Sequence, residues 1–138
     1  MKLQTENIFQ VVELRARPSD VYTIFLDAED HTMFTGMKAE IEPIEGGEFS
    51  ACNGRTKGHI LKLVTNKRII VAWTHKKFPT NQYSIVDIHI EKTEKGCRIN
   101  FNHLAVPDTL DGWLTDNWME TYWEPLARYV EEKVAEAV

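Results

Sequence analysis

Three of the four tryptophans lie in the last third of the sequence, within one long amphipathic pattern. Apolar side chains recur there at every fourth position and form one stripe on a helix: Leu114, Trp118, Tyr122, Leu126 and Val130. The pattern follows a run of strand signals, so we expect this helix to pack against a sheet. Pro125 cannot donate to the carbonyl of Thr121, so we expect the helix to bend there. An aromatic stripe at helical spacing is most often ordinary core, and the rest of the chain decides whether it also roofs a cavity.

The segments before this helix are strands, apart from two short helices near the start. A first strand over residues 7–16 precedes a helix that begins near Pro18; Asp27 can cap a second short helix, which Gly36 ends. Alternating residues predict strands at 37–42, 58–64, 69–75, 82–92 and 97–106, with a further strand around Phe49 and a tight hairpin turn at Asn53-Gly54. Runs of strands beside segregated helices indicate an α+β fold. We expect the helix-grip arrangement, in which a curved antiparallel sheet of six or seven strands wraps around a long C-terminal helix.

The composition is that of an acidic globular protein. The sequence has 138 residues and a net charge of −5, and we expect residues 1–138 to form a single domain. A pI near 5.5 argues against nucleic acid as the main partner. The first six residues contain no hydrophobic signal segment and no apolar run approaches a membrane span, so we expect a cytoplasmic protein with no membrane contact.

The spacing of cysteine and histidine favours neither a metal site nor a disulfide. Cys52 and Cys97 fall in predicted strands without a C-x-x-C partner, and the five histidines lack the spacing of metal ligands. No glycine-rich phosphate loop precedes a helix. We therefore expect no metal, no cofactor and no catalytic residue that the sequence by itself assigns.

Side-chain alternation predicts which residues of the strands face the helix. The predicted concave floor is apolar: Phe49, Leu61, Val71, Trp73, Val86, Ile88 and Phe101. The predicted roof is Trp118, Tyr122 and Leu126, with Phe34 at the mouth. His59, His103 and the Tyr122 hydroxyl are the polar groups of this set, and apolar walls with a few polar groups are typical of a small-molecule pocket. The alternative is that these side chains are core and that His103 is hydrogen-bonded to a neighbouring hydroxyl or carbonyl.

Six short motifs together resemble one family. They are Phe34-Thr35-Gly36, Gly46-Gly47-Glu48-Phe49, Gly54…Gly58-His59-Ile60-Leu61, Arg68-Ile69-Ile70-Val71-Ala72-Trp73, Gly112-Trp113 and Tyr122-Trp123-Glu124-Pro125-Leu126. In this order they resemble the Aha-type family, named for the activator of the ninety-kilodalton heat-shock chaperone's ATPase, within the START/Bet v-like (SRPBCC) superfamily. The resemblance covers nearly the whole chain and implies the helix-grip fold. In the eukaryotic co-chaperone it corresponds to the C-terminal half, and the N-terminal half with its activating motif has no counterpart in these residues.

Three hypotheses about function remain open. The first is a non-enzymatic domain that binds a small hydrophobic molecule between sheet and helix, as in other single-domain members of the superfamily. The second is a module that binds a heat-shock chaperone through its surface, which the family name implies. The third is an enzyme resembling polyketide cyclases and aromatases, for which His103 or Tyr122 would supply the acid or base. Exposed edge strands are compatible with either a monomer or a homodimer.

Overall fold

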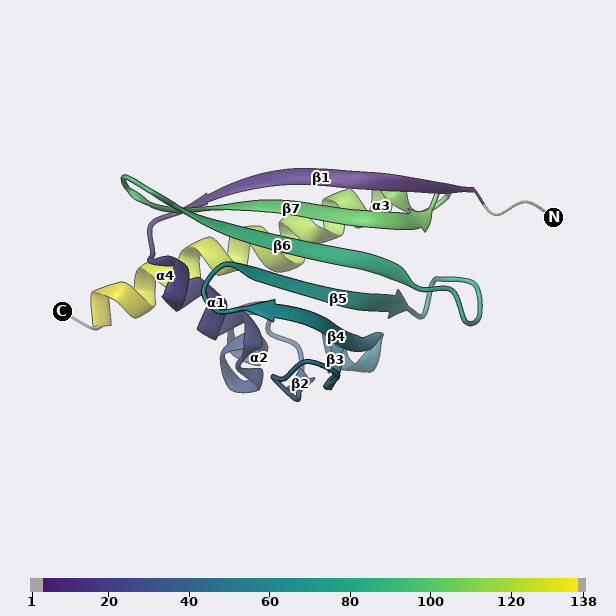
Figure 1. The fold of residues 1–138 in the computed structure, drawn as a ribbon, viewed down its shortest axis with the longest axis horizontal. Coiled ribbons are helices and arrows are strands. Elements are labelled where there is room, and N and C mark those ends of the chain that lie inside the picture. The colour runs from purple at the N-terminus through teal and green to yellow at the C-terminus, as the bar shows by residue number, and fades with distance from the viewer. Residues whose placement is uncertain (1–3, 137–138) are drawn as a thin grey trace.

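A computed structural model describes residues 4–136, with side chains up to Lys133. The elements follow the order predicted from the sequence (Figure 1): β1 (Thr5–Leu14), α1 (Pro18–Leu26), α2 (Ala28–Thr35), β2 (Glu40–Ile41), β3 (Glu48–Ala51), β4 (Thr56–Val64), β5 (Arg68–His75), β6 (Ser84–Thr93), β7 (Gly96–Pro107), α3 (Asp111–Asn117), a π-helical turn (Trp118–Trp123) and α4 (Glu124–Glu136). The helix-grip fold is therefore confirmed.

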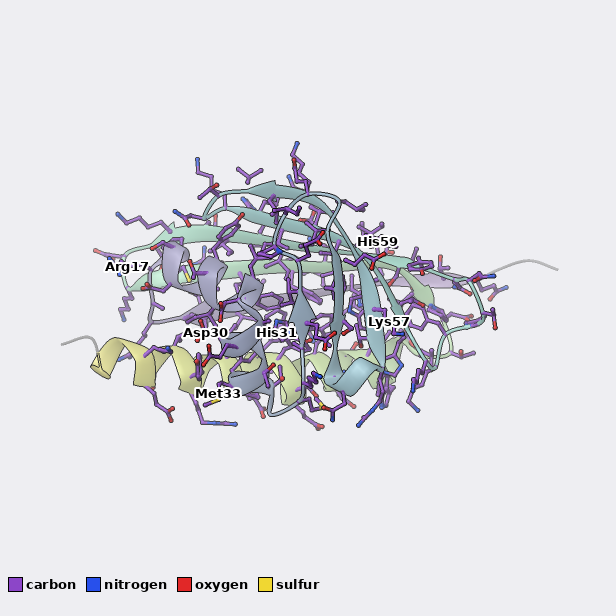
Figure 2. All side chains as sticks on the ribbon, turned by 90° about the horizontal axis from the view of Figure 1, so that it is seen from below. Arg17, Asp30, His31, Met33, Lys57 and His59 are labelled. Atoms are coloured by element: carbon purple, nitrogen blue, oxygen red, sulfur yellow. The ribbon has the colours of Figure 1, made fainter. Side chains whose placement is uncertain are left out.

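The seven strands form one antiparallel sheet in the order β1-β7-β6-β5-β4-β3-β2. The chain folds back by hairpins from β3 to β7, and β1 then pairs with β7 to add the far edge. The long helix crosses one face of the sheet, and α1 and α2 lie beside it near one end (Figures 1 and 2). The core therefore lies between this face and the helix.

Local signals in the sequence account for the ends of α2. The Asp27 carboxylate accepts a hydrogen bond from the backbone N–H of Asp30 at 2.9 Å, which satisfies one of the free donors of the first turn. At the other end Gly36 adopts a left-handed conformation with φ of 73°, as a helix C-terminus requires. Both expectations are confirmed.

The loop between β3 and β4 differs from the predicted two-residue turn. Cys52, Asn53 and Gly54 all have positive φ and form a tight helical turn. Arg55 follows this turn, immediately before β4 begins. The loop is longer because Ala51 pairs with Thr56 and leaves four residues between them. Cys52 therefore lies in a loop and not in a strand, whereas Cys97 lies in β7 as expected; both are buried free thiols.

The long helix changes its hydrogen-bond pattern immediately before Pro125. The N–H of Glu124 donates to the carbonyl of Met119, five residues earlier, so that a π-helical turn stands where a bend was expected. Tyr122 and Trp123, which are consecutive residues of this turn, are both buried. All five residues of the predicted apolar stripe are buried as well.

The predicted orientation of β4 is wrong at two positions of the proposed pocket. His59 and Leu61 face solvent, and Leu61 is 50% exposed. The inward residues are instead Thr56, Gly58 and Ile60. A bulge between Ile60 and Lys62 reverses the alternation, so Ile60 and the half-buried Leu63 both turn toward the core although they differ in parity.

Gly58 is needed where β4 passes close to β5 and to an aromatic ring. A Cβ built at this position would lie 1.8 Å from the carbonyl oxygen of Ala72 and 2.7 Å from the ring of Phe49. Both distances are far below contact, so the Phe49 ring can cover the strand only because residue 58 has no side chain.

Candidate functional site

A small apolar cavity lies between the sheet and the long helix, where the sequence predicted a pocket. Its volume is about 50 Å³, and its lining comes from α1, α2, five strands and the π-helical turn: Phe25, Leu26, His31, Ile41, Phe49, Ala51, Ile60, Ile69, Val71, Trp73, Ile88, Trp118 and Tyr122. Sites for drug-sized ligands measure about 300–1,000 Å³. Side chains therefore fill most of the space under the helix.

The structure divides the predicted site residues into three groups. Six of them line the cavity: Phe49, Val71, Trp73, Ile88, Trp118 and Tyr122. Five are buried in the surrounding core: Phe34, Val86, Phe101, His103 and Leu126. His59 and Leu61 lie outside because of the bulge in β4. The predicted floor and roof thus come together, except on β4.

Aromatic rings account for the small size of the cavity. The ring centroids of Phe101 and Trp118 are 4.5 Å apart, and those of Trp118 and Tyr122 are 4.6 Å apart. Trp73 meets the His103 ring edge to face at 4.7 Å. Edge-to-face and tilted contacts at these distances are typical of close aromatic packing. The roof rests directly on the floor.

His103 is fully buried and has partners on both ring nitrogens. The indole N–H of Trp118 donates to Nδ1 at 3.0 Å, so Nδ1 carries no proton. Nε2 therefore carries the proton and lies 2.7 Å from the Ser84 hydroxyl, which it donates to. That hydroxyl donates in turn to the carbonyl oxygen of Trp73 at 3.2 Å. Burial lowers the pKa of His103 to about 3, so the ring is neutral and bonded on both sides at neutral pH.

A second series of buried hydrogen bonds connects α2 to the long helix. Nδ1 of His31 lies 2.9 Å from the carbonyl oxygen of Phe25 and donates to it, because a carbonyl can only accept. Nε2 then accepts from the Tyr122 hydroxyl at 3.0 Å. Burial lowers the pKa of His31 and raises that of Tyr122. The Cys52 sulfur lies 3.9 Å from the same hydroxyl.

Of the seven lining residues that the sequence did not predict, His31 is the one with a titratable side chain. It stands three residues before Phe34 on α2, and residues three apart share a helix face. Phe34 was expected at the mouth, so the same spacing would have placed His31 there. Figure 2 shows His31 inside the molecule, between the sheet and the long helix. Its polar contacts link α2 to α1 and to the long helix.

A larger, open groove lies at the end of the molecule formed by the start of α1, the β6–β7 turn and α4. Its volume is about 710 Å³, and five cationic side chains line it: Arg15, Arg17, Lys92, Lys95 and Lys133. Three carboxylates lie among them: Asp20, Asp30 and Glu94. Figure 2 shows Arg17 and Asp30 toward this end. The groove combines an excess of positive charge with an apolar floor that includes Ile24 and Val130, in a chain whose net charge is −5.

Within residues 4–136, no group of three or more His, Cys, Asp or Glu side chains is arranged to hold a metal ion. None of the helices in this part of the chain combines the length and the apolar character that a membrane crossing requires.

The sequence matches a family model along most of its length. The model describes the Activator of Hsp90 ATPase homolog 1-like protein and matches residues 15–131. A curated relative, Activator of 90 kDa heat shock protein ATPase homolog 2 from Mus musculus, is 24% identical over 111 residues, which are 80% of this chain and 34% of that protein. The chain spans about a third of the length of the curated relatives it matches.

Solved structures share the fold at low sequence identity. An HSP90 activator from Plasmodium falciparum superposes with a TM-score of 0.78 at 19% identity, covering 86% of this chain and 91% of that one. The Aha1 dimer from Colwellia psychrerythraea gives a TM-score of 0.76 at 18% identity, covering 91% and 96%. Likeness at this identity establishes the fold and nothing further.

Proposed function

The chain belongs to the Activator of Hsp90 ATPase homolog 1-like family, and from this membership we propose that it binds an Hsp90-class chaperone through its surface. The family match over residues 15–131 carries the proposal. The interior supports it, because a cavity of about 50 Å³ leaves little room for a ligand to be the main partner. A protein whose core is filled acts through what it presents outside.

The basic groove is the surface that we assign to this contact. It offers about 710 Å³ of open space with cations from three separate elements around it. Such a surface steers a negatively charged partner toward the molecule although the chain as a whole is acidic. Two of the cations are already oriented, since Arg17 pairs with Asp20 at 3.1 Å and Lys133 with Asp30 at 3.4 Å. Lys92, near the end of β6, and Lys95, in the β6–β7 turn, flank the groove.

The test uses the purified chain and the Hsp90-class chaperone of its own host. Calorimetry measures binding, and a coupled assay measures the chaperone's ATPase rate with and without saturating chain. We expect binding and a changed ATPase rate. The double variant Lys92→Glu/Lys95→Glu should weaken binding by about tenfold, because it reverses charge at the groove. The control Lys57→Glu/Lys62→Glu makes the same charge change on β4, where both lysines are exposed.

Each outcome decides part of the proposal. No binding and no ATPase change at saturation would overturn the chaperone function. Equal weakening by both double variants would keep the function and move the contact away from the groove. Binding with an unchanged ATPase rate would make the chain an Hsp90-binding module that does not activate.

Binding of a small hydrophobic molecule is the second candidate, and one observation favours it. The cavity lies directly under the π-helical turn that carries Trp118 and Tyr122, and such turns occur often at functional sites. Occupation by a ligand would require one of these rings to swing away from the floor. The walls of the cavity are apolar, and the Tyr122 hydroxyl and His31 provide polar groups that a ligand could contact.

Native and denaturing mass spectrometry of the protein purified from its host test this candidate. A mass excess over 16.0 kDa that disappears on denaturation would support it. The variant Ala51→Val adds two methyl groups at the cavity wall and should abolish the excess while the fold persists. A wild-type protein without any mass excess would be evidence against this candidate function.

The cyclase-like enzyme receives the least support. At neutral pH both nitrogens of His103 are occupied by Trp118 and Ser84, and its low pKa makes it a poor base. The raised pKa of Tyr122 likewise makes its hydroxyl a poor acid. Turnover that disappears in His103→Gln while folding persists would restore this hypothesis.

A further inference from the structure

β1 forms one edge of the sheet and lies open along its length. It ends the strand order, and Figure 1 shows it at the upper margin with no element beyond it. The strand is ten residues long, whereas β2 at the opposite edge has only two. An edge strand presents a row of unpaired backbone N–H and C=O groups that can pair with another strand.

The middle of β1 has none of the features that usually protect an edge strand. Proteins block such edges with charged side chains, proline or bulges. The bulge in the β1–β7 pairing lies beside Asn7, before the middle segment, and its extra residue belongs to β7. Residues 8–12 of β1 contain neither a charge nor a proline. On the face away from the helix, Phe9 is 63% exposed and Val11 is 50% exposed.

We propose that β1 pairs antiparallel with β1 of a second copy of this chain, about a two-fold axis at Gln10, to form a homodimer with a continuous sheet. In this register Phe9 lies opposite Val11 of the second copy on the outer face. Ile8 lies opposite the second copy's Val12 on the helix side. Aromatic and β-branched residues are favourable partners across antiparallel strands. Every apolar residue of the segment thus meets an apolar residue.

The neighbouring registers lack this self-complementarity. An axis at Phe9 would place Val11 opposite Asn7 and Ile8 opposite Gln10. An axis at Val11 would place Phe9 opposite the Glu13 carboxylate. A shift by one residue would put side chains of opposite faces against each other. The Gln10 register also keeps like charges apart, because it places Glu13 opposite Asn7.

The Gln10 side chain does not obstruct the pairing. Its Nε2 donates to the carbonyl oxygen of Thr115 at 3.0 Å, and its Oε1 accepts from the indole N–H of Trp123 at 2.7 Å. These bonds hold the side chain against the long helix, so it does not compete with the backbone N–H and C=O groups for pairing at the strand edge. The axis position therefore has a fixed rotamer before a second copy arrives.

Sedimentation velocity over a concentration series tests the dimer. We expect a species of twice the 16.0 kDa chain mass whose population rises with concentration. Val11→Glu should weaken association by at least about tenfold, because the change occurs twice in a symmetric interface. The control Leu61→Glu makes the same kind of change on β4 at an equal exposure of 50% and should leave association unchanged. Circular dichroism verifies that both variants fold.

Disulfide trapping tests the register. An equal mixture of the Phe9→Cys and Val11→Cys variants should give the mixed disulfide in excess over both homodisulfides, because directly opposed Cα atoms lie within bonding range whereas diagonal ones do not. A monomer at every concentration, or a dimer that survives Val11→Glu, would overturn the proposal. An excess of homodisulfides would overturn the register.

Discussion

Acid should destabilise this protein through His103, and the effect can be worked out from its surroundings. The ring is buried between Trp118 and Ser84 and has a pKa of about 3, whereas an unfolded histidine titrates near 6.5. Below pH 6.5 the unfolded chain therefore binds a proton that the folded chain does not. His103 therefore does not reduce the free energy of unfolding above that pH, and it reduces it progressively as the pH decreases toward 3.

The size of the loss follows from linkage. Each pH unit in this window costs about 1.4 kcal/mol, so His103 alone should lower the free energy of unfolding by about 2 kcal/mol between pH 7 and pH 5. That is a large share of the roughly 5–15 kcal/mol that keeps a domain folded. The lowered pKa values of the buried His31 and of His75 have the same sign and add to the loss.

Urea unfolding followed by tryptophan fluorescence at the two pH values measures the effect. The variant His103→Gln keeps one acceptor and one donor in the site but cannot be protonated in this range. We expect it to be less stable than the wild type at pH 7 and to lose about 2 kcal/mol less between pH 7 and pH 5. His89→Gln removes an imidazole from an exposed position on β6 and serves as the control.

Two results would contradict the assignment of this acid sensitivity to His103. One is an equal loss of stability in the wild type and in His103→Gln between pH 7 and pH 5. The other is a titration of the wild-type protein by nuclear magnetic resonance that gives His103 a midpoint near its ordinary value. The second measurement does not depend on whether the variant folds.

Three further substitutions test other parts of the structure by urea unfolding at pH 7. Gly58→Ala should destabilise by about 3 kcal/mol or more, because its Cβ would overlap backbone and ring atoms, and Gly112→Ala, whose Cβ would meet nothing within 4 Å, should be neutral or slightly stabilising; equal effects would contradict the packing of β4. Tyr122→Phe should cost about 1–3 kcal/mol, because it leaves Nε2 of the buried His31 without its donor, and an unchanged stability would contradict that contact. Asp27→Ala should lower the free energy of unfolding by about 1 kcal/mol through loss of the α2 cap. A larger loss than in Gly58→Ala would contradict the expectation that the close approach at Gly58 matters more than this cap.

Local sequence signals predicted the elements and their order. The period of four in the apolar stripe identified the long helix, and Asp27 and Gly36 marked the ends of α2. These features depend on residues close together in the chain, so a linear pattern contains them. The same alternation correctly oriented β5, β6 and β7 in the core.

The remaining features depend on segments that only the folded chain brings together. The bulge in β4 reversed an alternation that looked regular and moved His59 and Leu61 outside. The partners of His103 lie on β6 and on the long helix, which no spacing in the sequence connects. The size of the cavity is the small difference between the space enclosed by sheet and helix and the volume of the rings that fill it. The helix-grip fold and, outside β4, most of the core residues named in advance follow from the linear sequence. The tertiary structure decided how much empty space remains, because that quantity depends on how side chains from distant segments pack against one another.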